Sequence, residues 1–177
     1  MYSLVLTLHS LVRWLVVGLA ALGIARGLAG KDTPWSAADE TARRWLPHAF
    51  TLQLLLGLAL YGGLSPSTKL AMGNMGAAMK DPALRFWAVE HLTVMILALA
   101  LAHIGGARTR RAADVAAKRR TMLTFFGLAT VLVLWAIPWK SRPMLRLGGT
   151  PDAPMAPAAP AAPEMPVPPA PPAPPAP

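Results

Sequence analysis

Ionisable side chains are rare in the long apolar stretches of this chain, and most of those present are histidines. His9 and Arg13 lie four residues apart in "LHSLVRW", so on a helix they share one face. Glu90 and His91 adjoin each other in a second apolar stretch, "FWAVEHLTVMILALALAHIGG". Imidazoles from two helices that face each other across a bundle can hold a haem iron between them. The residue types therefore predict a b-type haem site, with His9 and His91 as axial ligands.

The depths of the histidines support this pairing. His9 and His91 each lie about five residues below the outer end of their stretch, so at about 1.5 Å per residue they share a level. His48 and His103 form a second pair at the opposite end, where histidines also serve as helix caps or interfacial residues. His91 and His103 are twelve residues apart and point about 120° apart on a helix, which favours a single haem at the outer level.

Other polar residues could support the ligands. Arg13 could neutralise a haem propionate, or it could pair with Glu90. Glu90 could instead orient a histidine by accepting its second N–H group. Gln53 is a further polar residue within an apolar stretch. Ordinary hydrogen-bonded histidines, with no cofactor, are the alternative interpretation of the whole set.

A second candidate metal site contains only methionines. Met72, Met75 and Met79 recur at spacings of three and four in "KLAMGNMGAAMKDP", on one side of a predicted short helix. Thioethers are soft ligands suited to Cu(I). The alternative is an amphipathic helix lying on a membrane surface, with methionine as its apolar stripe.

The elements that would position these residues are membrane spans. Hydrophobic residues make up 54% of the 177 residues and charged residues only 14%, and four stretches approach the 20 apolar residues that cross a bilayer. We predict an all-α fold, a four-helix transmembrane bundle over residues 1–140. Its spans are about 4–26, 46–64, 86–107 and 121–139. Pro47 and Pro82 fall near predicted helix starts, Pro138 ends the last span, and the glycines and arginines of "GGARTRR" end the third.

The distribution of basic residues predicts the orientation. Ten lysines and arginines lie in the first and third loops, and six lie in the second loop and after the last span. The ten-residue side should be cytoplasmic, which leaves the N-terminus, the second loop and the tail outside. We therefore interpret the net charge of +9 as a signal of membrane topology. We do not expect nucleic acid as a partner. The charged loop "ARTRRAADVAAKRR" is expected to be solvated.

Further features of the sequence limit the classes of function and cofactor that are possible. Residues 141–177 are rich in proline and alanine, which predicts an extended outward tail, either disordered or docked on another membrane subunit. The chain has no cysteine, which excludes thiolate metal sites and covalently attached haem. No nucleophile–base pair or phosphate-binding loop points to hydrolytic or nucleotide chemistry. Glycines 18, 23 and 27 are expected at close helix contacts.

Four segments carry a resemblance to a known group. "LHSLVRW", "PHAFTLQLLLGLALY", "MKDPALRFWAVEH" and "AIPW" resemble small bacterial four-span membrane proteins labelled cytochrome-b-like. There is a more distant similarity to copper-resistance D type proteins. The resemblance covers residues 1–140 and implies roles for His9, Arg13, His48, Glu90 and His91. It implies an inner-membrane haem protein in electron transfer. An accessory subunit of a larger complex, or a copper-handling protein, is the alternative.

Overall fold

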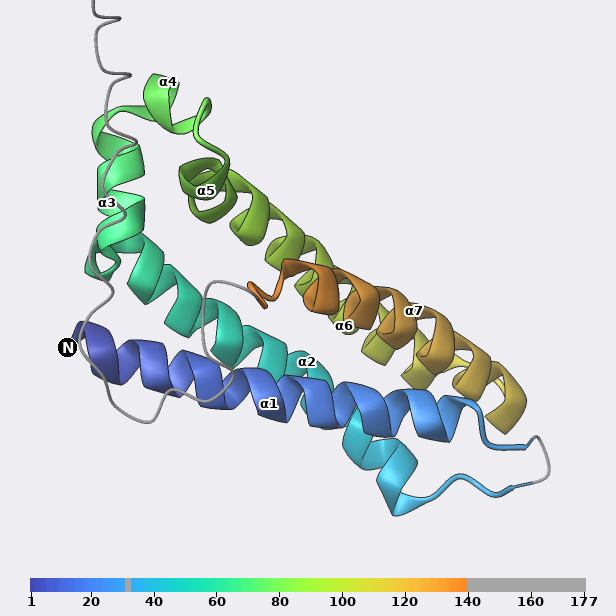
Figure 1. The fold of residues 1–177 in the computed structure, drawn as a ribbon. Helices are drawn as coiled ribbons and strands as arrows, with labels where there is room; N and C mark the ends of the chain where they lie inside the picture. Colours follow the sequence, from blue (N-terminus) through green and yellow to red (C-terminus); the bar gives the residue numbers. More distant parts are fainter. Residues whose placement is uncertain (31–32, 140–177) are drawn as a thin grey trace, which may run out of the picture.

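The computed structural model describes residues 1–30 and 33–139, and all regular structure within these ranges is helical. Four long helices form the body of the protein (Figure 1). They are α1 (Tyr2–Gly27), α2 (Ala37–Ala59), α6 (His91–Arg111) and α7 (Val115–Ala136). The connection from α2 to α6 consists of η1 (Leu60–Leu64), α3 (Pro66–Gly73), α4 (Met75–Ala78), α5 (Pro82–Arg85) and η2 (Phe86–Glu90).

Membrane-length helices are confirmed in part. Three helical stretches are long and apolar enough to cross a bilayer: Tyr2–Gly27, Pro82–Arg111 and Val115–Ala136. The second predicted span falls within a bent pair, Ala37–Leu64 and Pro66–Gly73, which meet at 56° and qualify only when taken together. The Pro/Ala-rich tail lies outside the described residues.

The start of α2 differs from the prediction. Ser36 caps the helix, and its side chain and the Asp39 side chain each bind the other residue's backbone amide in a capping box. Because α2 therefore begins at Ala37, Pro47 lies inside the helix and not near its start. Proline has no amide to donate, so the Arg43 carbonyl lacks its usual helical partner. The prediction for Pro82 is confirmed, since it begins α5.

Several glycines mark close contacts between helices. Helix α6 continues through Gly105 and Gly106 and ends at Arg111, the last residue of the segment "GGARTRR". A Cβ atom on Gly105 would lie 2.5 Å from the Phe125 Cβ of α7. Gly23 and Gly27 of α1 similarly touch Phe126 and Leu123 of α7, which confirms two of the three predicted contacts. Gly18 has nothing within 4 Å, so the third is wrong.

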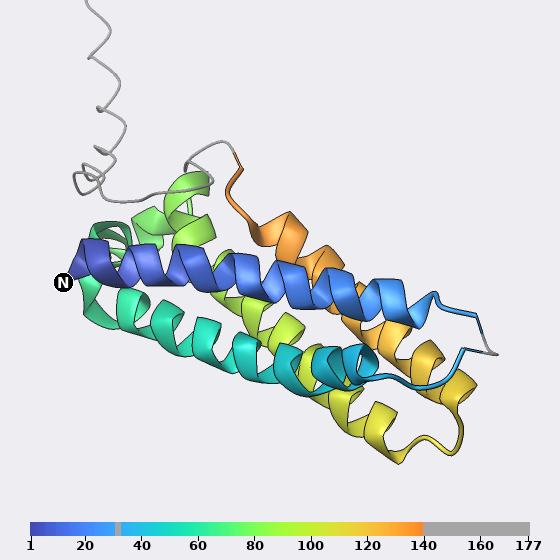
Figure 2. The same ribbon diagram turned by 90° about the horizontal axis from the view of Figure 1, so that it is seen from below.

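The long helices pack as two antiparallel pairs, α1 with α2 and α6 with α7 (Figures 1 and 2). The pairs lie close together at the end that holds the α1–α2 and α6–α7 connections, and they diverge toward the N-terminus (Figure 1). Side chains from all four helices fill the space between them. They include Val16, Ala20, Leu46, Phe50, Ala102, Met122 and Phe126. The short helices of the second connection occupy the divergent end.

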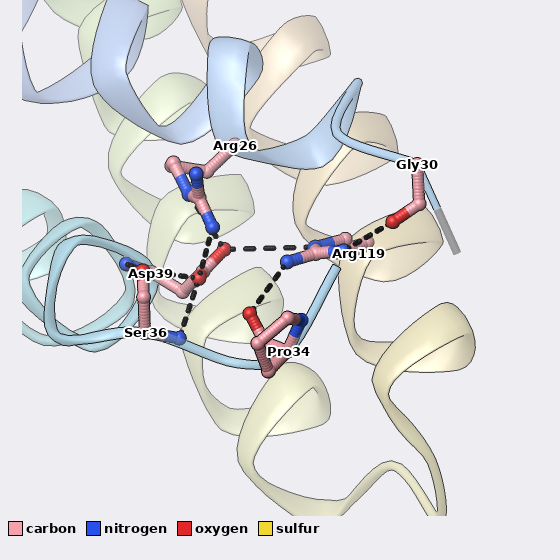
Figure 3. Close-up of polar contacts among 6 residues, drawn as sticks. All are labelled: Arg26, Gly30, Pro34, Ser36, Asp39 and Arg119. Carbon is pink, nitrogen blue, oxygen red and sulfur yellow. Dashed lines mark hydrogen bonds and ion pairs between the residues drawn. The ribbon is translucent and has the colours of Figure 1, made fainter. Parts of the chain in front are cut away.

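A buried polar cluster joins the helices at the close end (Figure 3). Asp39 of α2 is fully buried, and Arg26 of α1 donates to its two carboxylate oxygens at 3.2 and 2.8 Å. Arg119 of α7 is 3% exposed and lies 3.7 Å from the same carboxylate. Its guanidinium also donates to the carbonyl oxygens of Gly30 and Pro34, at 2.6 and 3.1 Å. The expectation of a fully solvated charged loop is therefore wrong for Arg119. We call Arg26, Ser36, Asp39 and Arg119 the Asp39 cluster.

Candidate functional site

A cavity of about 110 Å³ lies between the two helix pairs on the N-terminal side of the core. Its walls come from every long helix and from both π-helical segments. The polar groups that face it include His9, Arg13, Gln53, Tyr61 and His91, and the apolar ones include Phe50, Leu60, Trp87, Met95, Val133, Ala136 and Ile137. We call it the histidine cavity. The predicted outer pair, His9 and His91, thus lines one space.

The cavity exists because α7 is short. Helix α1 has 26 residues and α7 has 22, which correspond to about 39 and 33 Å. Helix α7 ends at Ala136 ahead of Pro138, as the sequence predicted, while α1 extends further and α6 is preceded by η2 and α5 (Figure 1). Ala136, Ile137 and Pro138 therefore line the space that another turn of α7 would fill.

Two wide turns shape the walls at this level. Segment η1 extends α2 as a π-helix and supplies Leu60 and Tyr61, and π-helical η2 precedes α6 and supplies Trp87. The Tyr61 hydroxyl donates to the Ala88 carbonyl oxygen at 2.9 Å, which joins the two segments. Single π-helical turns inside α-helices are frequent at functional sites. Here two of them border one cavity.

His91 is held in one tautomer by the main chain. Its Nδ1 lies 3.1 Å from the carbonyl oxygen of Ala136, at the end of α7. A carbonyl oxygen only accepts, so Nδ1 carries the proton and donates, and in the neutral imidazole Nε2 then carries the lone pair. The rings of Phe86 and Trp87 lie 5.7 and 5.6 Å from the imidazole. A metal-binding histidine is typically oriented by such a bond from its other nitrogen.

His9 is positioned by two residues of α2. Its Nε2 accepts from the Gln53 amide nitrogen at 3.1 Å. A Cβ atom on Gly57 would lie 3.3 Å from the His9 Cε1, so the absence of a side chain at Gly57 makes room for the ring. The Gln53 Oε1 is buried and has no hydrogen-bond partner among the described residues. A buried acceptor of this kind calls for a donor from water or from a ligand.

Arg13 and Glu90 have separate surroundings. Arg13 lines the histidine cavity, and its guanidinium carbon lies 5.5 Å from the centre of the Trp14 ring. Glu90 accepts from Arg85 at 2.7 Å, beside the short helix α5, and is not among the residues that line the cavity. The orienting role that the sequence suggested for Glu90 is filled at His91 by the Ala136 carbonyl.

His48 and His103 lie together in a different hollow, on the outer face of α2 and α6. It measures about 430 Å³ and is lined by Arg43, Arg44, Pro47, His48, His103, Gly106, Ala107 and Arg110. Both histidines are exposed. The Thr51 hydroxyl lies 2.9 Å from the His103 Nε2, and the His48 ring packs edge-on to Trp45 at 6.0 Å. His91 and His103 thus face separate spaces. We call this one the basic hollow.

The methionines do not share one helix, so that prediction is wrong. Met72 belongs to α3, Met75 begins α4, and Met79 follows the end of α4. Asn74 separates the helices, and its side chain accepts from the Ala77 amide to cap α4. All three methionines are at least 40% exposed. Copper binding there stays a prediction.

Sequence reasoning identified His9 and His91 but assigned no role to their partners. The Ala136 carbonyl gives no signal in the sequence, because every residue has one. Gln53 did give a signal, as a polar residue in an apolar stretch, but only the fold places it beside His9. No group of three acidic or histidine side chains within residues 1–30 and 33–139 is arranged to hold a metal ion. In comparisons with known proteins, no family model, curated protein or solved structure matches the chain.

Proposed function

We propose that this chain is an integral membrane protein that binds a b-type haem in the histidine cavity and takes part in electron transfer. The observation that carries the proposal is that His9 of α1 and His91 of α6 line one cavity together with Arg13. When bound, haem supplies an iron that can be reduced and oxidised by one electron. The protein residues would hold the group, set its surroundings and exclude water.

The chemistry of the lining residues fits this group in several respects. His91 already donates from Nδ1 to a main-chain oxygen, so its Nε2 is the nitrogen suited to bind iron. Arg13 would neutralise a propionate, and Phe50, Met95 and Val133 offer apolar surface to a porphyrin. Binding through the His9 Nε2 would replace its contact with Gln53. A porphyrin is larger than a cavity of about 110 Å³, so the proposal requires α1 and α6 to move apart as the group enters.

The proposed setting is a bacterial inner membrane crossed four times, with the bent α2–α3 pair counted as one span. The ends of α1 and α6 and the starts of α2 and α7 lie at one end of the bundle (Figure 1). This end carries most of the described lysines and arginines, so it would be cytoplasmic. The cavity would then lie toward the outer side. Docking of the tail on a partner subunit concerns residues outside the described part.

The test is an absorption spectrum of the full chain purified from haem-replete membranes. We expect a Soret band from the unaltered protein, a shifted band in the single variants His9→Ala and His91→Ala, and its loss in the double variant, because the double variant would lack both of the proposed iron ligands. His48→Ala is the matched control. It also replaces a histidine on a long helix, but this histidine lines the basic hollow.

The outcomes are distinct. A colourless preparation of folded protein, even after addition of hemin, would overturn the proposal. If His48→Ala removed the band and His9→Ala did not, the haem would belong to the other end of the molecule.

A further inference from the structure

We propose that the basic hollow binds the phosphodiester headgroup of an anionic phospholipid. This inference is independent of haem, since no residue lines both the basic hollow and the histidine cavity. It rests on four observations: the cationic lining, the absence of a carboxylate from that lining, the shape of the α2–α6 contact, and the apolar surface beside the hollow.

The lining of the basic hollow is cationic. Arg43 and Arg44 come from α2, Arg110 comes from α6, and His48 and His103 add two imidazoles. Arginine presents several N–H donors in a planar fork that matches the oxygens of a phosphate group. No carboxylate lines the hollow within the described residues.

The nearest acidic residues along α2 are already paired. Asp39 is bound by Arg26 in the Asp39 cluster, and Glu40 accepts from Arg43. Arg44 lies over the ring of Trp45, with its guanidinium carbon 5.8 Å from the ring centre, and it is exposed. Arg110 is exposed on the facing helix. The positive charge of Arg44 and Arg110 is therefore directed at the surface of the molecule and is available to an anion.

The hollow exists because two helices approach closely at one point. A Cβ atom on Gly106 would lie 3.1 Å from the Pro47 Cγ and 3.2 Å from the Arg43 carbonyl oxygen. Because these distances are shorter than ordinary van der Waals contacts, a glycine at this position allows the two helices to approach without displacing either backbone. Arg43 and Arg44 on α2 and Arg110 on α6 lie on either side of this contact and line an open hollow of about 430 Å³.

The neighbouring surface is apolar, which favours a lipid over a free anion. Leu52 and Leu55 follow His48 along α2 and are 46% and 59% exposed. On α6, Ile96 lies seven residues before His103, on the same face of the helix, and is 46% exposed. A lipid whose headgroup occupied the hollow could lay its acyl chains along these residues. Basic pockets between membrane helices on the cytoplasmic side are known to take anionic headgroups.

The test compares phosphatidylglycerol with phosphatidylcholine, each added to the full chain in a neutral detergent. Native mass spectrometry measures the lipid retained, and thermal unfolding measures the stabilisation. We expect one phosphatidylglycerol to be retained in preference to phosphatidylcholine. The double variant Arg44→Gln, Arg110→Gln should weaken its binding by about tenfold or more, because two contacts to the headgroup are lost.

The control variant Arg111→Gln, Arg120→Gln removes the same charge from exposed arginines that do not line the hollow. It should retain phosphatidylglycerol as the unaltered protein does. Equal weakening in both double variants would overturn the proposal, because the attraction would then be diffuse. Equal retention of phosphatidylcholine, or equal stabilisation by inorganic phosphate alone, would also overturn it.

A second variant covers the case in which the first does not fold. Ala107→Phe places a bulky side chain at an exposed position in the wall of the hollow and removes no charge. It should reduce phosphatidylglycerol retention to a similar degree. Unchanged retention in this variant would show that the lipid binds elsewhere.

Discussion

Most of the polar contacts at the close end of the bundle involve Asp39. Two guanidinium groups and the Ser36 capping group lie around its carboxylate, and the side chain is fully buried. A buried ion pair is costly to break, because the partner that remains keeps a charge without compensation. An exposed pair contributes little, since water screens it and the side chains lose rotamer freedom. Asp39 and its neighbour Glu40 provide both cases within one turn of α2.

We predict that Asp39→Asn destabilises the protein by about 3 kcal/mol or more. The variant keeps the size of the side chain but removes the charge that faces Arg26 and the buried Arg119. Thermal and denaturant unfolding of the purified protein in detergent, followed by circular dichroism, provides the measurement.

Glu40→Gln is the control for this prediction. The Glu40 side chain is 47% exposed and pairs with Arg43 on the same helix, so its loss should cost no more than about 1 kcal/mol. Similar losses in the two variants would mean that burial of the Asp39 cluster does not determine its contribution.

At the residue scale, the sequence predicts positions better than partners. Counting residues from the outer ends of two apolar stretches brought His9 and His91 to one level, and the structure shows both in one cavity. The contact of His9 with Gln53 depends on the rotation of α1 against α2, which a single sequence does not specify. The role of Asp39 was missed because it depends on Arg26 in the preceding helix and on Arg119, which lies 80 residues further along the chain.

At the element scale, glycines decide how closely the helices pack. Gly27 faces the backbone of α7, where an added Cβ atom would lie 3.1 Å from the Leu123 Cα and 2.8 Å from its Cβ. Gly18, also on α1, has open space around it. The same residue type therefore has two different roles on one helix.

We predict that Gly27→Ala destabilises the protein by about 1–3 kcal/mol, because α1 must move away from α7. Gly18→Ala should be neutral or stabilising by up to about 1 kcal/mol, because alanine favours the helix and meets no neighbour. Unfolding of both variants by heat in the same detergent tests the difference. A larger loss from Gly18→Ala than from Gly27→Ala would contradict the assigned contacts.

Element ends were predictable where local chemistry fixes them. Pro138 does end α7, and Pro82 does begin α5. The starts of α2 and α7 were predicted too far along the chain because hydropathy marks the apolar part of a helix and not its capped polar end. Ser36 and Asp39 carry the capping signal that hydropathy misses. The two π-helical segments gave no signal in the sequence.

At the scale of the whole molecule, the two ends differ. One end holds the Asp39 cluster and the basic hollow, and the other holds the histidine cavity and the short helices α3, α4 and α5. If the proposed topology holds, Ala77 of α4 and Ala113, between α6 and α7, lie on opposite sides of the membrane. Both alanines are exposed.

We predict that a membrane-impermeant maleimide labels Ala77→Cys, but not Ala113→Cys, in right-side-out vesicles. The unaltered chain contains no cysteine, so each variant carries a single reactive site. Inside-out vesicles should give the opposite pattern, which controls for the reactivity of each site. Labelling of both sites from one side would contradict an odd number of crossings between them, and a reversed pattern would contradict the orientation.

The bond between His91 and Ala136 has an evolutionary consequence. The acceptor is a main-chain oxygen, so it requires no particular functional group at position 136, and any residue small enough for this buried position keeps it in place. What must be inherited is the count of residues in α7, because one insertion or deletion would turn its final carbonyl groups by about 100° and shift them by about 1.5 Å. Selection on the protonation of His91 would therefore be visible as intolerance of length changes in α7, even where the sequence of that helix varies freely.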